Sequence, residues 1–523
     1  MLLQADKITF GYSEKPLFKQ ASFTINEGDR IGLVGDNGAG KSTLFKCLLG
    51  IEQPYEGKVI VSKNVGKIAY IPQSLPTDLQ NKNFYDYLLE AIPHDERDYS
   101  EWKVDMAMDE IGVPQEIRNF PLSHLSGGWQ RMALIARATM DEPGLILMDE
   151  PTNYLDLEKI FKLEDLLLNT IKTPYVVISH DRKFLDRCTN KTMHLRDGQI
   201  ICHKVPYSHA RTCLLEEDLA AAKARENEEA EIERIRAAAK RIHIWSAGRN
   251  PDMDRRAKAM YTRANQLEAK KTEIYVAAKR DIDFNPEDIK PKMLLRVTNY
   301  QVVAPDGRCL FKIKNMNVNK GDRVAILATN GVGKTQMLEA LMRAYNDPVV
   351  DKQNDTEMRF NPQVSIGYFD QHMAHLPLQR TLSDYIQSLG KTTQETTKLL
   401  INAGFPYKMH SQKISELSQG EKARLAFLGL KVGKYNFFIM DEPTNHIDID
   451  GQEKFEDAVI SEGHTCIFVS HDRYMMEQVA NKYYQVKGGI LTQVDSVEPF
   501  YKEVMQKQDI LMFEKINAKG NQK

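Results

Sequence analysis

The sequence predicts an α/β protein in which one domain occurs twice in tandem and a helical hairpin links the two copies. Four short motifs recur in the same order, at offsets of 293, 292, 292 and 291 residues. A shared order and offset indicate a duplication rather than a chance of composition. The motif pairs are Gly35-x4-Gly40-Lys41-Ser42 with Ala328-x4-Gly333-Lys334-Thr335, Leu125-Ser126-Gly127-Gly128 with Leu417-Ser418-Gln419-Gly420, Met148-Asp149-Glu150-Pro151-Thr152-Asn153 with Met440-Asp441-Glu442-Pro443-Thr444-Asn445, and Ser179-His180-Asp181-Arg182 with Ser470-His471-Asp472-Arg473.

Short apolar runs beside these motifs predict the buried parallel strands of each copy. In the first copy, a glycine loop joins an expected strand at Arg30–Val34 to an expected helix at Ser42–Leu49. The other expected strands are Leu145–Met148 and Tyr175–Ile178 in the first copy, and Val324–Leu327, Phe437–Met440 and Cys466–Val469 in the second. Each copy is therefore expected to be an α/β domain.

The segment between the copies differs in composition and is expected to form two long helices. From about Leu214 to Arg280 it is rich in Ala, Glu, Lys and Arg, and residues 246–251 interrupt the helical spacing. Residues 216–233 hold eight acidic and two basic side chains, whereas residues 234–280 hold four acidic and thirteen basic ones. We assign residues 1–207 to the first domain, 208–290 to a basic helical linker, and 291–523 to the second domain with a short C-terminal tail.

The overall composition is that of a globular protein and excludes several classes of protein. The chain has 523 residues, of which 42% are hydrophobic and 27% charged, and its net charge of -2 indicates no global attraction to nucleic acid or membrane. Its six cysteines form no C-x-x-C pair, which argues against zinc ribbons, iron–sulfur sites and disulfide frameworks. The N-terminus does not resemble a signal peptide, and no apolar run reaches the ~18–20 residues that cross a bilayer. A cytoplasmic protein is expected.

Each glycine loop is expected to bind phosphate. Backbone N–H groups converge there on phosphate oxygens, and the helix N-terminus adds positive potential. Lys41 is expected to reach the β- and γ-phosphates, and the hydroxyl of Ser42 to bind Mg²⁺. A plain glycine turn is the alternative for one loop taken alone.

Two carboxylates end an apolar strand in each copy. Asp149 is expected to complete the Mg²⁺ shell and Glu150 to orient or deprotonate the attacking water, as are Asp441 and Glu442 in the second copy. A solvated loop is the alternative, and the matching phosphate loops in both copies disfavour it. The remaining candidates are His180 and His471 for the γ-phosphate and its water, and Gln73 and Gln371 for Mg²⁺ or water, with packed or surface residues as the alternative.

The Ser-Gly-Gly-Trp and Ser-Gln-Gly-Glu segments precede helices expected to begin near Gln130 and Glu421. A serine hydroxyl and glycine N–H groups at a helix start form another anion site. Because each glycine loop already serves its own nucleotide, we expect this second element to complete the nucleotide held by the other copy.

In this order, the motifs resemble those of an ATP-binding cassette (ABC) ATPase, a P-loop NTPase. The Asp-Glu-Pro-Thr-Asn-x-[Leu/Ile]-Asp form, at residues 149–156 and 441–448, and the charged linker without a membrane domain resemble the ABC-F subfamily of translation factors and ribosome-protection ATPases. The resemblance covers nearly the whole chain. It implies hydrolysis of two ATP molecules per chain, with Mg²⁺, at head-to-tail interfaces within one monomer.

Carried over by motif, the resemblance implies a set of site residues. Tyr12 fits the aromatic residue that stacks on adenine, with an ordinary strand tyrosine as the alternative. The implied ATP-binding residues are Tyr12, Gly35, Asn37, Gly38, Gly40, Lys41, Ser42, Thr43, Gln73, Ser126, Gly127, Gly128, Asn330, Gly331, Gly333, Lys334, Thr335, Gln371, Ser418, Gln419 and Gly420. The implied Mg²⁺ ligands are Ser42, Gln73, Asp149, Thr335, Gln371 and Asp441, and the catalytic residues are Glu150, Glu442, His180 and His471.

The sequence departs from the family pattern at four places. Ala328 replaces the first loop glycine, and alanine disfavours the positive φ that glycine permits. We therefore expect the Lys334 site to bind or hydrolyse ATP differently from the Lys41 site. No aromatic residue clearly aligns with Tyr12 in the second copy, Tyr300 being a loose candidate. The other departures are Gln419 for glycine and Tyr154 where many members have histidine.

The basic linker is the candidate RNA-contacting element. A solvated spacer is the alternative, but a spacer has no need to gather cations near one end. The candidate residues for a phosphate backbone are Arg249, Arg255, Arg256, Lys258 and Arg263. Trp245 and Tyr261 are expected to pack rather than to stack on bases. In the resembled family this linker enters the ribosome near the tRNA acceptor end and the peptidyl-transferase centre, so we expect contact with rRNA and tRNA.

Other functions stay open at this point. The chain is also compatible with an ATPase subunit that energises a separate membrane transporter. A DNA-repair or chromosome-organising ATPase is less favoured, because those usually carry long coiled coils or zinc modules inside the cassette. The sequence does not separate a translation factor from an antibiotic-resistance protein.

Overall fold

The computed structural model describes residues 1–12, 16–246, 250–272, 292–351, 353–370, 373, 375–445, 447–461 and 463–506. The chain divides into two compact units. One unit combines Met1–Cys202 with Lys279–Lys523 and holds both α/β domains, and the other is His203–Ala278.

The first domain is built on a six-stranded sheet of order β5-β6-β7-β3-β8-β9. Neighbouring strands from β5 to β8 run parallel. A separate antiparallel sheet has the order β2-β1-β4. The strands are β1 Leu3–Phe10, β2 Phe18–Ile25, β3 Arg30–Gly35, β4 Glu56–Val61, β5 Ile68–Ile71, β6 Leu145–Asp149, β7 Tyr175–Ile178, β8 Lys191–Arg196 and β9 Gln199–His203. The α-helices are α1 Lys41–Leu48, α2 Phe84–Leu89, α3 Arg97–Ser100, α4 Trp102–Glu110, α5 Gly127–Met140, α6 Leu157–Asp165 and α7 Arg182–Cys188.

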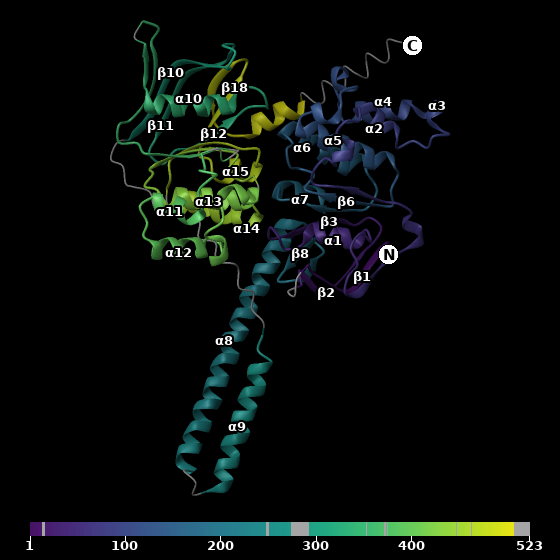
Figure 1. Cartoon of the computed structure of the whole chain (residues 1–523), viewed down its shortest axis with the longest axis vertical. Helices are drawn as coiled ribbons and strands as arrows, with labels where there is room; N and C mark the ends of the chain where they lie inside the picture. The colour runs from purple at the N-terminus through teal and green to yellow at the C-terminus, as the bar shows by residue number, and fades with distance from the viewer. Residues whose placement is uncertain are drawn as a thin grey trace. The chain divides into compact units, whose positions relative to one another are not determined.

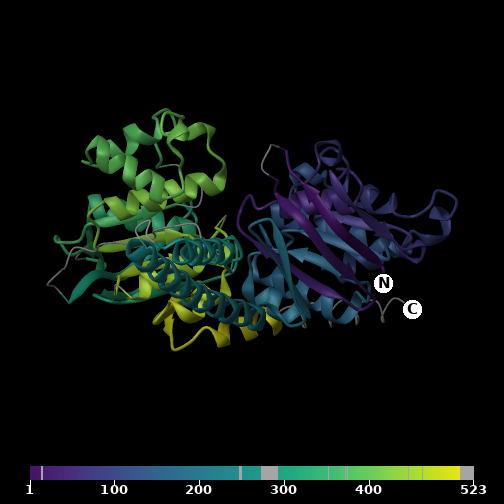
Figure 2. The same ribbon diagram turned by 90° about the horizontal axis from the view of Figure 1, so that it is seen from below.

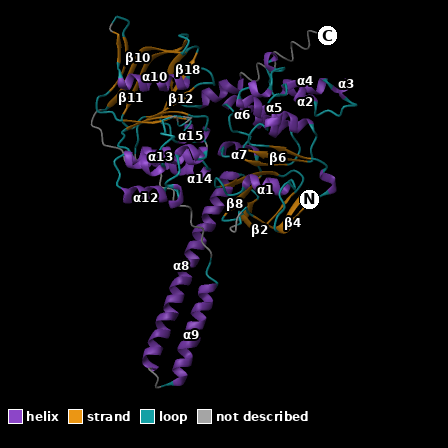
Figure 3. Cartoon of the chain, in the orientation of Figure 1, coloured by secondary structure: helices purple, strands orange, loops and turns teal. Residues whose placement is uncertain are grey.

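The second domain repeats this plan in one ten-stranded sheet of order β13-β14-β10-β11-β19-β18-β12-β17-β16-β15. Its parallel part, β15-β16-β17-β12-β18, has the order of β5-β6-β7-β3-β8. Figure 3 shows that strands and helices occur together in both domains. The strands are β10 Met293–Val303, β11 Cys309–Asn319, β12 Arg323–Leu327, β13 Val349–Asp351, β14 Thr356–Phe360, β15 Ile366–Phe369, β16 Phe437–Asp441, β17 Cys466–Val469, β18 Lys482–Lys487 and β19 Ile490–Val494. The α-helices are α10 Lys334–Asn346, α11 Leu382–Ser388, α12 Thr393–Asn402, α13 Gln419–Val432, α14 Ile449–Ser461 and α15 Arg473–Gln478. The duplication of an α/β domain is confirmed.

Two helices begin earlier than the sequence predicted. Helix α5 starts at Gly127 and α13 at Gln419, because Ser126 and Ser418 hold the extended backbone of N-cap residues. The glycines of both motifs therefore lie in or next to the first turn.

The apolar core crosses from one domain to the other. Leu157 and Phe161 of α6 belong to a buried cluster that otherwise lies in the second domain, with Phe455 and Phe468 among its members. The rings of Phe161 and Tyr501 meet edge to face, with centroids 5.9 Å apart. Helix α6, which follows the repeated Asp-Glu-Pro-Thr-Asn motif, thus packs on the second domain.

The second unit is a helical hairpin of α8, Tyr207–Ser246, and α9, Pro251–Ala269 (Figure 1). Both views show the two helices side by side (Figure 2). An ion pair joins Arg236 to Glu268 at 2.9 Å, and a hydrogen bond of 2.9 Å joins His243 to Asp254. Helix α9 starts with Pro251 behind the N-cap Asn250, whose side chain accepts from two backbone N–H groups.

The hairpin differs from the expectation at both ends. Helix α8 begins at Tyr207, before Leu214, and α9 ends at Ala269, before Arg280. Trp245 is 80% exposed, so its expected packing is wrong, whereas Tyr261 is partly buried. Among the described residues, no helix is both long and apolar enough to span a membrane. The boundaries assigned to the linker and to the two domains stay predictions.

Candidate functional site

A cavity of about 1370 Å³ in the first unit collects the repeated motifs of both domains. Its lining includes all the ATP-site residues expected from the sequence except two. Gly35 does not line it, and Gln371 lies outside the described residues. The expected residues that line it are Tyr12, Asn37, Gly38, Gly40, Lys41, Ser42, Thr43, Gln73, Ser126, Gly127, Gly128, Asp149, Glu150, His180, Asn330, Gly331, Gly333, Lys334, Thr335, Ser418, Gln419, Gly420, Asp441, Glu442 and His471.

The first glycine loop joins β3 to α1. Gly38 and Gly40 have φ of 81° and 100°, the left-handed region that glycine adopts without steric cost. The ammonium of Lys41 donates to the carbonyl oxygens of Gly35, at 2.6 Å, and Asp36, at 3.1 Å. Burial lowers the pKa of Lys41, an effect that the charge of Glu150 opposes. The Lys41 ammonium thus bonds to the backbone of its own loop, and a bound polyphosphate would compete with these carbonyl oxygens for it.

The carboxylates of the first site lie at the end of β6. Asp149 accepts hydrogen bonds from the hydroxyls of Ser42 and Tyr70. The backbone of Glu150 has φ of 50°, a strained conformation for a residue with a side chain, and its N–H donates to Ile178 of β7 at 2.9 Å. Burial, more than any neighbouring charge, raises the pKa of Glu150 to about 7. Its Oε1 lies 3.1 Å from Nε2 of His180.

The second site has the same plan. The hydroxyl of Thr335 donates to Asp441 at 2.8 Å, and Glu442, with φ of 49°, accepts from the backbone N–H of His471 at 3.0 Å. The Nε2 atom of His471 lies 3.2 Å from the ammonium of Lys334 and 2.9 Å from Oδ1 of Asn330. Burial raises the pKa of Glu442 to about 7. Burial lowers the pKa of His471 well below its ordinary value, so the ring is neutral at pH 7.

The expectation that the first loop position needs a glycine for its positive φ is wrong. Neither Gly35 nor Ala328 has a positive φ, so conformational freedom is not what this position needs. A Cβ atom built on Gly35 would lie 2.4 Å from the carbonyl oxygen of Leu195 in β8. In the second domain Ala328 is accommodated and buried. The requirement in the first domain is therefore close packing against β8.

Each glycine loop also faces an aspartate of the opposite domain. The backbone N–H of Asn37 donates to Oδ2 of Asp448 at 3.0 Å, although the two residues are 411 positions apart. The charge of Asp448 raises the pKa of Lys41, and the charge of Asp156 raises that of Lys334, in both cases against the larger effect of burial. These aspartates end the repeated Asp-Glu-Pro-Thr-Asn-x-[Leu/Ile]-Asp motif, a signal that we did not use to predict a role.

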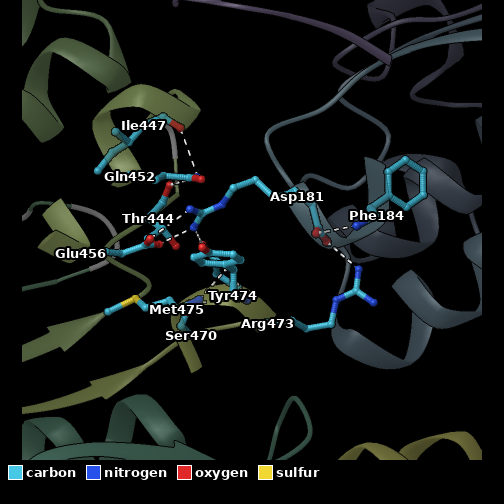
Figure 4. A network of polar contacts seen from close by, with 12 residues as sticks. Asp181, Phe184, Thr444, Ile447, Gln452, Glu456, Ser470, Arg473, Tyr474 and Met475 are labelled. Carbon is cyan, nitrogen blue, oxygen red and sulfur yellow. Dashed lines mark hydrogen bonds and ion pairs between the residues drawn. The ribbon is translucent and has the colours of Figure 1, made fainter. Parts of the chain in front are cut away.

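Two buried arginines join the domains beside the site. Arg182 pairs with both carboxylate oxygens of Glu456, one at 3.0 Å, and its guanidinium lies 3.7 Å from the ring centroid of Tyr474. Arg473 forms an ion pair with Glu164 at 2.6 Å. It also contacts Asp181 at 3.1 Å (Figure 4). Arg182 is 4% exposed and Arg473 is 3% exposed.

Two predicted residues are placed by neighbours that the sequence did not reveal. The buried guanidinium of Arg131 in α5 donates to the carbonyl oxygens of Pro72 and Gln73, which anchors the glutamine loop. Tyr12 is 63% exposed at the cavity and donates to Glu52 at 3.1 Å. Tyr300, the loose counterpart, does not line the cavity.

The tandem sheets, paired glycine loops and paired carboxylates define an ABC-type ATPase. The family model described as "ABC transporter" matches residues 18–153 and 311–445, and the chain belongs to this family. Its relatives are ABC-F proteins, which confirms that subfamily, the tandem ATPase fold and ATP hydrolysis as the activity.

Individual relatives agree with this assignment over nearly the full chain. The chain is 28% identical to "ABC transporter F family member 5" of Arabidopsis thaliana, over 96% of this chain and 77% of that protein. It is 26% identical to "Ribosome protection protein VmlR" of Bacillus subtilis, over 94% and 88%. The solved complex of archaeal ribosome recycling factor aABCE1 with ribosomal stalk protein aP1 shares the fold, with a TM-score of 0.63, 18% identity and coverage of 95% and 92%.

Proposed function

We propose that this chain is an ABC-F ATPase that closes on two ATP molecules and binds the ribosome in that closed state. Its linker contacts tRNA and rRNA near the peptidyl-transferase centre, and hydrolysis releases it. Such a protein acts in the cytoplasm, in translation regulation or in ribosome protection against an antibiotic. The hydrogen bond between Asn37 and Asp448 carries the proposal, because it brings the glycine loop of one domain against the motif of the other.

The residues present fit ATP and Mg²⁺ in each site. Hydroxyl and carboxylate oxygens are the donors that Mg²⁺ prefers, and Thr335 with Asp441, at 2.8 Å, supplies them, as do Ser42 and Asp149. When bound, the ion neutralises charge on the β- and γ-phosphates. The serine and glycines of the opposite domain complete each site.

The buried glutamates supply the hydrolytic step. Phosphoryl transfer needs positioned charge and an oriented water more than covalent chemistry. Glu150 in its ionised form accepts a proton from water that attacks the γ-phosphate, and His180, 3.1 Å away, helps to hold that water. Glu442 and His471 do the same at the second site.

The linker supports the RNA contact through its exposed cations. The side chains of Arg255, Lys258 and Arg263 are 84%, 79% and 69% exposed. Their distances to acidic partners, 3.7–3.9 Å, are at the limit of an ion pair. Exposed pairs of this kind contribute about 0–1 kcal/mol, so a phosphate backbone can replace the acidic partner. Arg256 is exposed on the same helix, and Arg249 lies outside the described residues.

Ribosome co-sedimentation of the Glu150→Gln/Glu442→Gln variant tests the proposal. This variant is expected to remain with ribosomes in ATP and to separate from them in ADP, because it closes without hydrolysing. The unaltered chain, which turns ATP over, is the control. Failure of the variant to sediment with ribosomes in ATP would contradict the ribosomal function. Recovery of a membrane protein without rRNA would favour the transporter-subunit alternative instead.

A further inference from the structure

The two composite ATP sites differ on the side contributed by the opposite domain. The offset of 292 residues aligns Trp129 of the first domain with Glu421 of the second, and Lys159 with Gly451. If the first domain completes the Lys334 site, it contributes the lysine Lys159 and the aromatic ring of Trp129 there. At the Lys41 site, the second domain contributes Glu421 and Gly451 at the same two positions.

Three contacts fix Lys159 beside the Ser-Gly-Gly segment. Its ammonium lies 2.8 Å from Oδ2 of Asp156 and 4.8 Å from the ring centroid of Trp129. Its stem covers Gly128, since a Cβ atom built there would lie 3.2 Å from Cδ of Lys159. The side chain is 17% exposed and lines the cavity. A cation over an aromatic face and beside a carboxylate is held in place before any ligand arrives.

This lysine acts on the site of the second domain. Its charge contributes to the lowered pKa of His471, after burial and the charge of Lys334. Its partner Asp156 raises the pKa of Lys334, against the effect of burial. Lys159 and Asp156 therefore lie within electrostatic reach of the loop that holds the phosphates of the second nucleotide.

At the Lys41 site, the opposite domain contributes a negative charge instead of a positive one. The Glu421 carboxylate accepts from the hydroxyl of Ser418 at 2.7 Å and from its backbone N–H at 2.9 Å, in a capping box. This pairing occupies the serine and places a negative charge at the segment that faces the first nucleotide. The side chain of Ser126 makes no such capping bond.

We propose that Lys159 is an ATP-binding residue that acts across the domain interface, placing a cation on the terminal phosphate of the nucleotide held by the Lys334 loop. The inference rests on the proposed sharing of each ATP between two domains. Trp129 and Asp156 orient the ammonium, and the γ-phosphate displaces Asp156 as its partner. The Lys334 site thereby distinguishes ATP from ADP more strongly than the Lys41 site.

Fluorescent ATP and ADP analogues, titrated into the full chain, test this inference. In a non-hydrolysing Glu150→Gln/Glu442→Gln background, Lys41→Ala leaves the Lys334 site to be measured alone, and Lys334→Ala leaves the other. Lys159→Gln is expected to weaken ATP binding at the Lys334 site about tenfold or more, as for a lost hydrogen bond to a charged group. ADP binding there, and ATP binding at the Lys41 site, are expected to change less than twofold.

Lys162→Gln is the matched control, because Lys162 lies one turn further along α6, pairs with Asp165 at 3.9 Å, and does not line the cavity. Lys159→Arg is expected to restore most of the ATP affinity, which a loss of folding would not allow. Unchanged ATP affinity at the Lys334 site, or equal weakening of ATP and ADP at both sites, overturns the inference. Absence of ATP binding in both single-site backgrounds before Lys159 is altered would instead refute the proposed function.

Discussion

Arg182 of the first domain and Glu456 of the second form a buried ion pair that joins the two domains. Arg182 follows His180 by two residues and begins α7, and its guanidinium bonds to both oxygens of Glu456. The mirrored pair of Arg473 with Glu164 follows His471 in the same way. A movement of either histidine loop therefore acts directly on the facing domain.

Breaking this pair from one side is expected to weaken the whole interface. Removal of one partner from a buried pair leaves an uncompensated charge and costs about 3–5 kcal/mol. We expect Glu456→Ala to lower the free energy of unfolding by that order, and to lower ATPase activity with it. Urea denaturation, followed together with ATP turnover, measures both effects.

The pair of Lys183 with Glu477 provides a matched control. It forms at 2.7 Å, but its side chains are 36% and 26% exposed, so solvent screens it. Glu477→Ala is expected to cost less than about 1 kcal/mol. The double variant Arg182→Ala/Glu456→Ala should cost less than the two single changes added together. Additive single effects would show that the ion pair does not couple the domains.

Substitutions at the first position of the glycine loop are expected to have different effects in the two domains. Gly35→Ala is expected to cost about 1–3 kcal/mol and to reduce ATP binding at the Lys41 site, because the new Cβ would collide with the carbonyl of Leu195. Ala328→Gly is expected to cost less than about 1 kcal/mol, because it removes no clash and adds only the chain entropy that glycine loses at an ordinary φ. Thermal unfolding and ATP titration measure both changes. Equal tolerance at the two positions would refute the packing explanation.

Much of the lining of the cavity that collects the repeated motifs could be predicted, because residues of one motif are neighbours in the chain. Lys41 and Ser42 share one loop, and Asp149 and Glu150 end one strand, so residue type and spacing were enough. The six strands predicted beside the motifs, at β3, β6, β7, β12, β16 and β17, match the structure to within one residue at each end, because short apolar runs end at motifs rich in glycine or charge. The other strands of the two domains were not predicted. The duplication itself was readable from the constant offset.

The interface could not be predicted because it depends on the packing of distant segments. Arg182 and Glu456 are 274 positions apart, and each alone looks like a surface charge. The role proposed for Lys159 depends on its contact with Trp129, which lies in the preceding helix α5. The packing of Gly35 on Leu195 was hidden for the same reason, and positive φ was assumed in its place.

The raised pKa values of Glu150 and Glu442 predict a pH dependence of hydrolysis. Both lie near 7 because burial disfavours the ionised carboxylate. Since only the carboxylate accepts a proton from water, ATPase activity is expected to rise with pH from about 6 to 8. Steady-state rates at saturating ATP, with ATP affinity measured in parallel, check this. A flat profile over that range would remove the two glutamates as proton acceptors.

The salt dependence of ribosome binding tests the exposed cations of α9. The logarithm of the binding constant falls with the logarithm of salt concentration, by roughly 0.7–0.9 for each phosphate contact. Arg255→Gln, Lys258→Gln and Arg263→Gln are each expected to reduce this slope by the amount that corresponds to one phosphate contact, roughly 0.7–0.9. Arg255→Lys and Arg263→Lys keep the charge and should keep the slope. Slopes unchanged by all three glutamine variants would exclude these residues from RNA contact.

The sharing of each ATP between the domains is tested most directly by crossed inactivation. With Lys334→Ala, only the Lys41 site hydrolyses ATP, and Ser418→Arg should then abolish turnover, because Ser418 faces that site from the second domain. Ser126→Arg should leave this turnover largely intact, and with Lys41→Ala the two serines should exchange roles. Loss of turnover only when the altered serine and the working loop belong to the same domain would contradict the account.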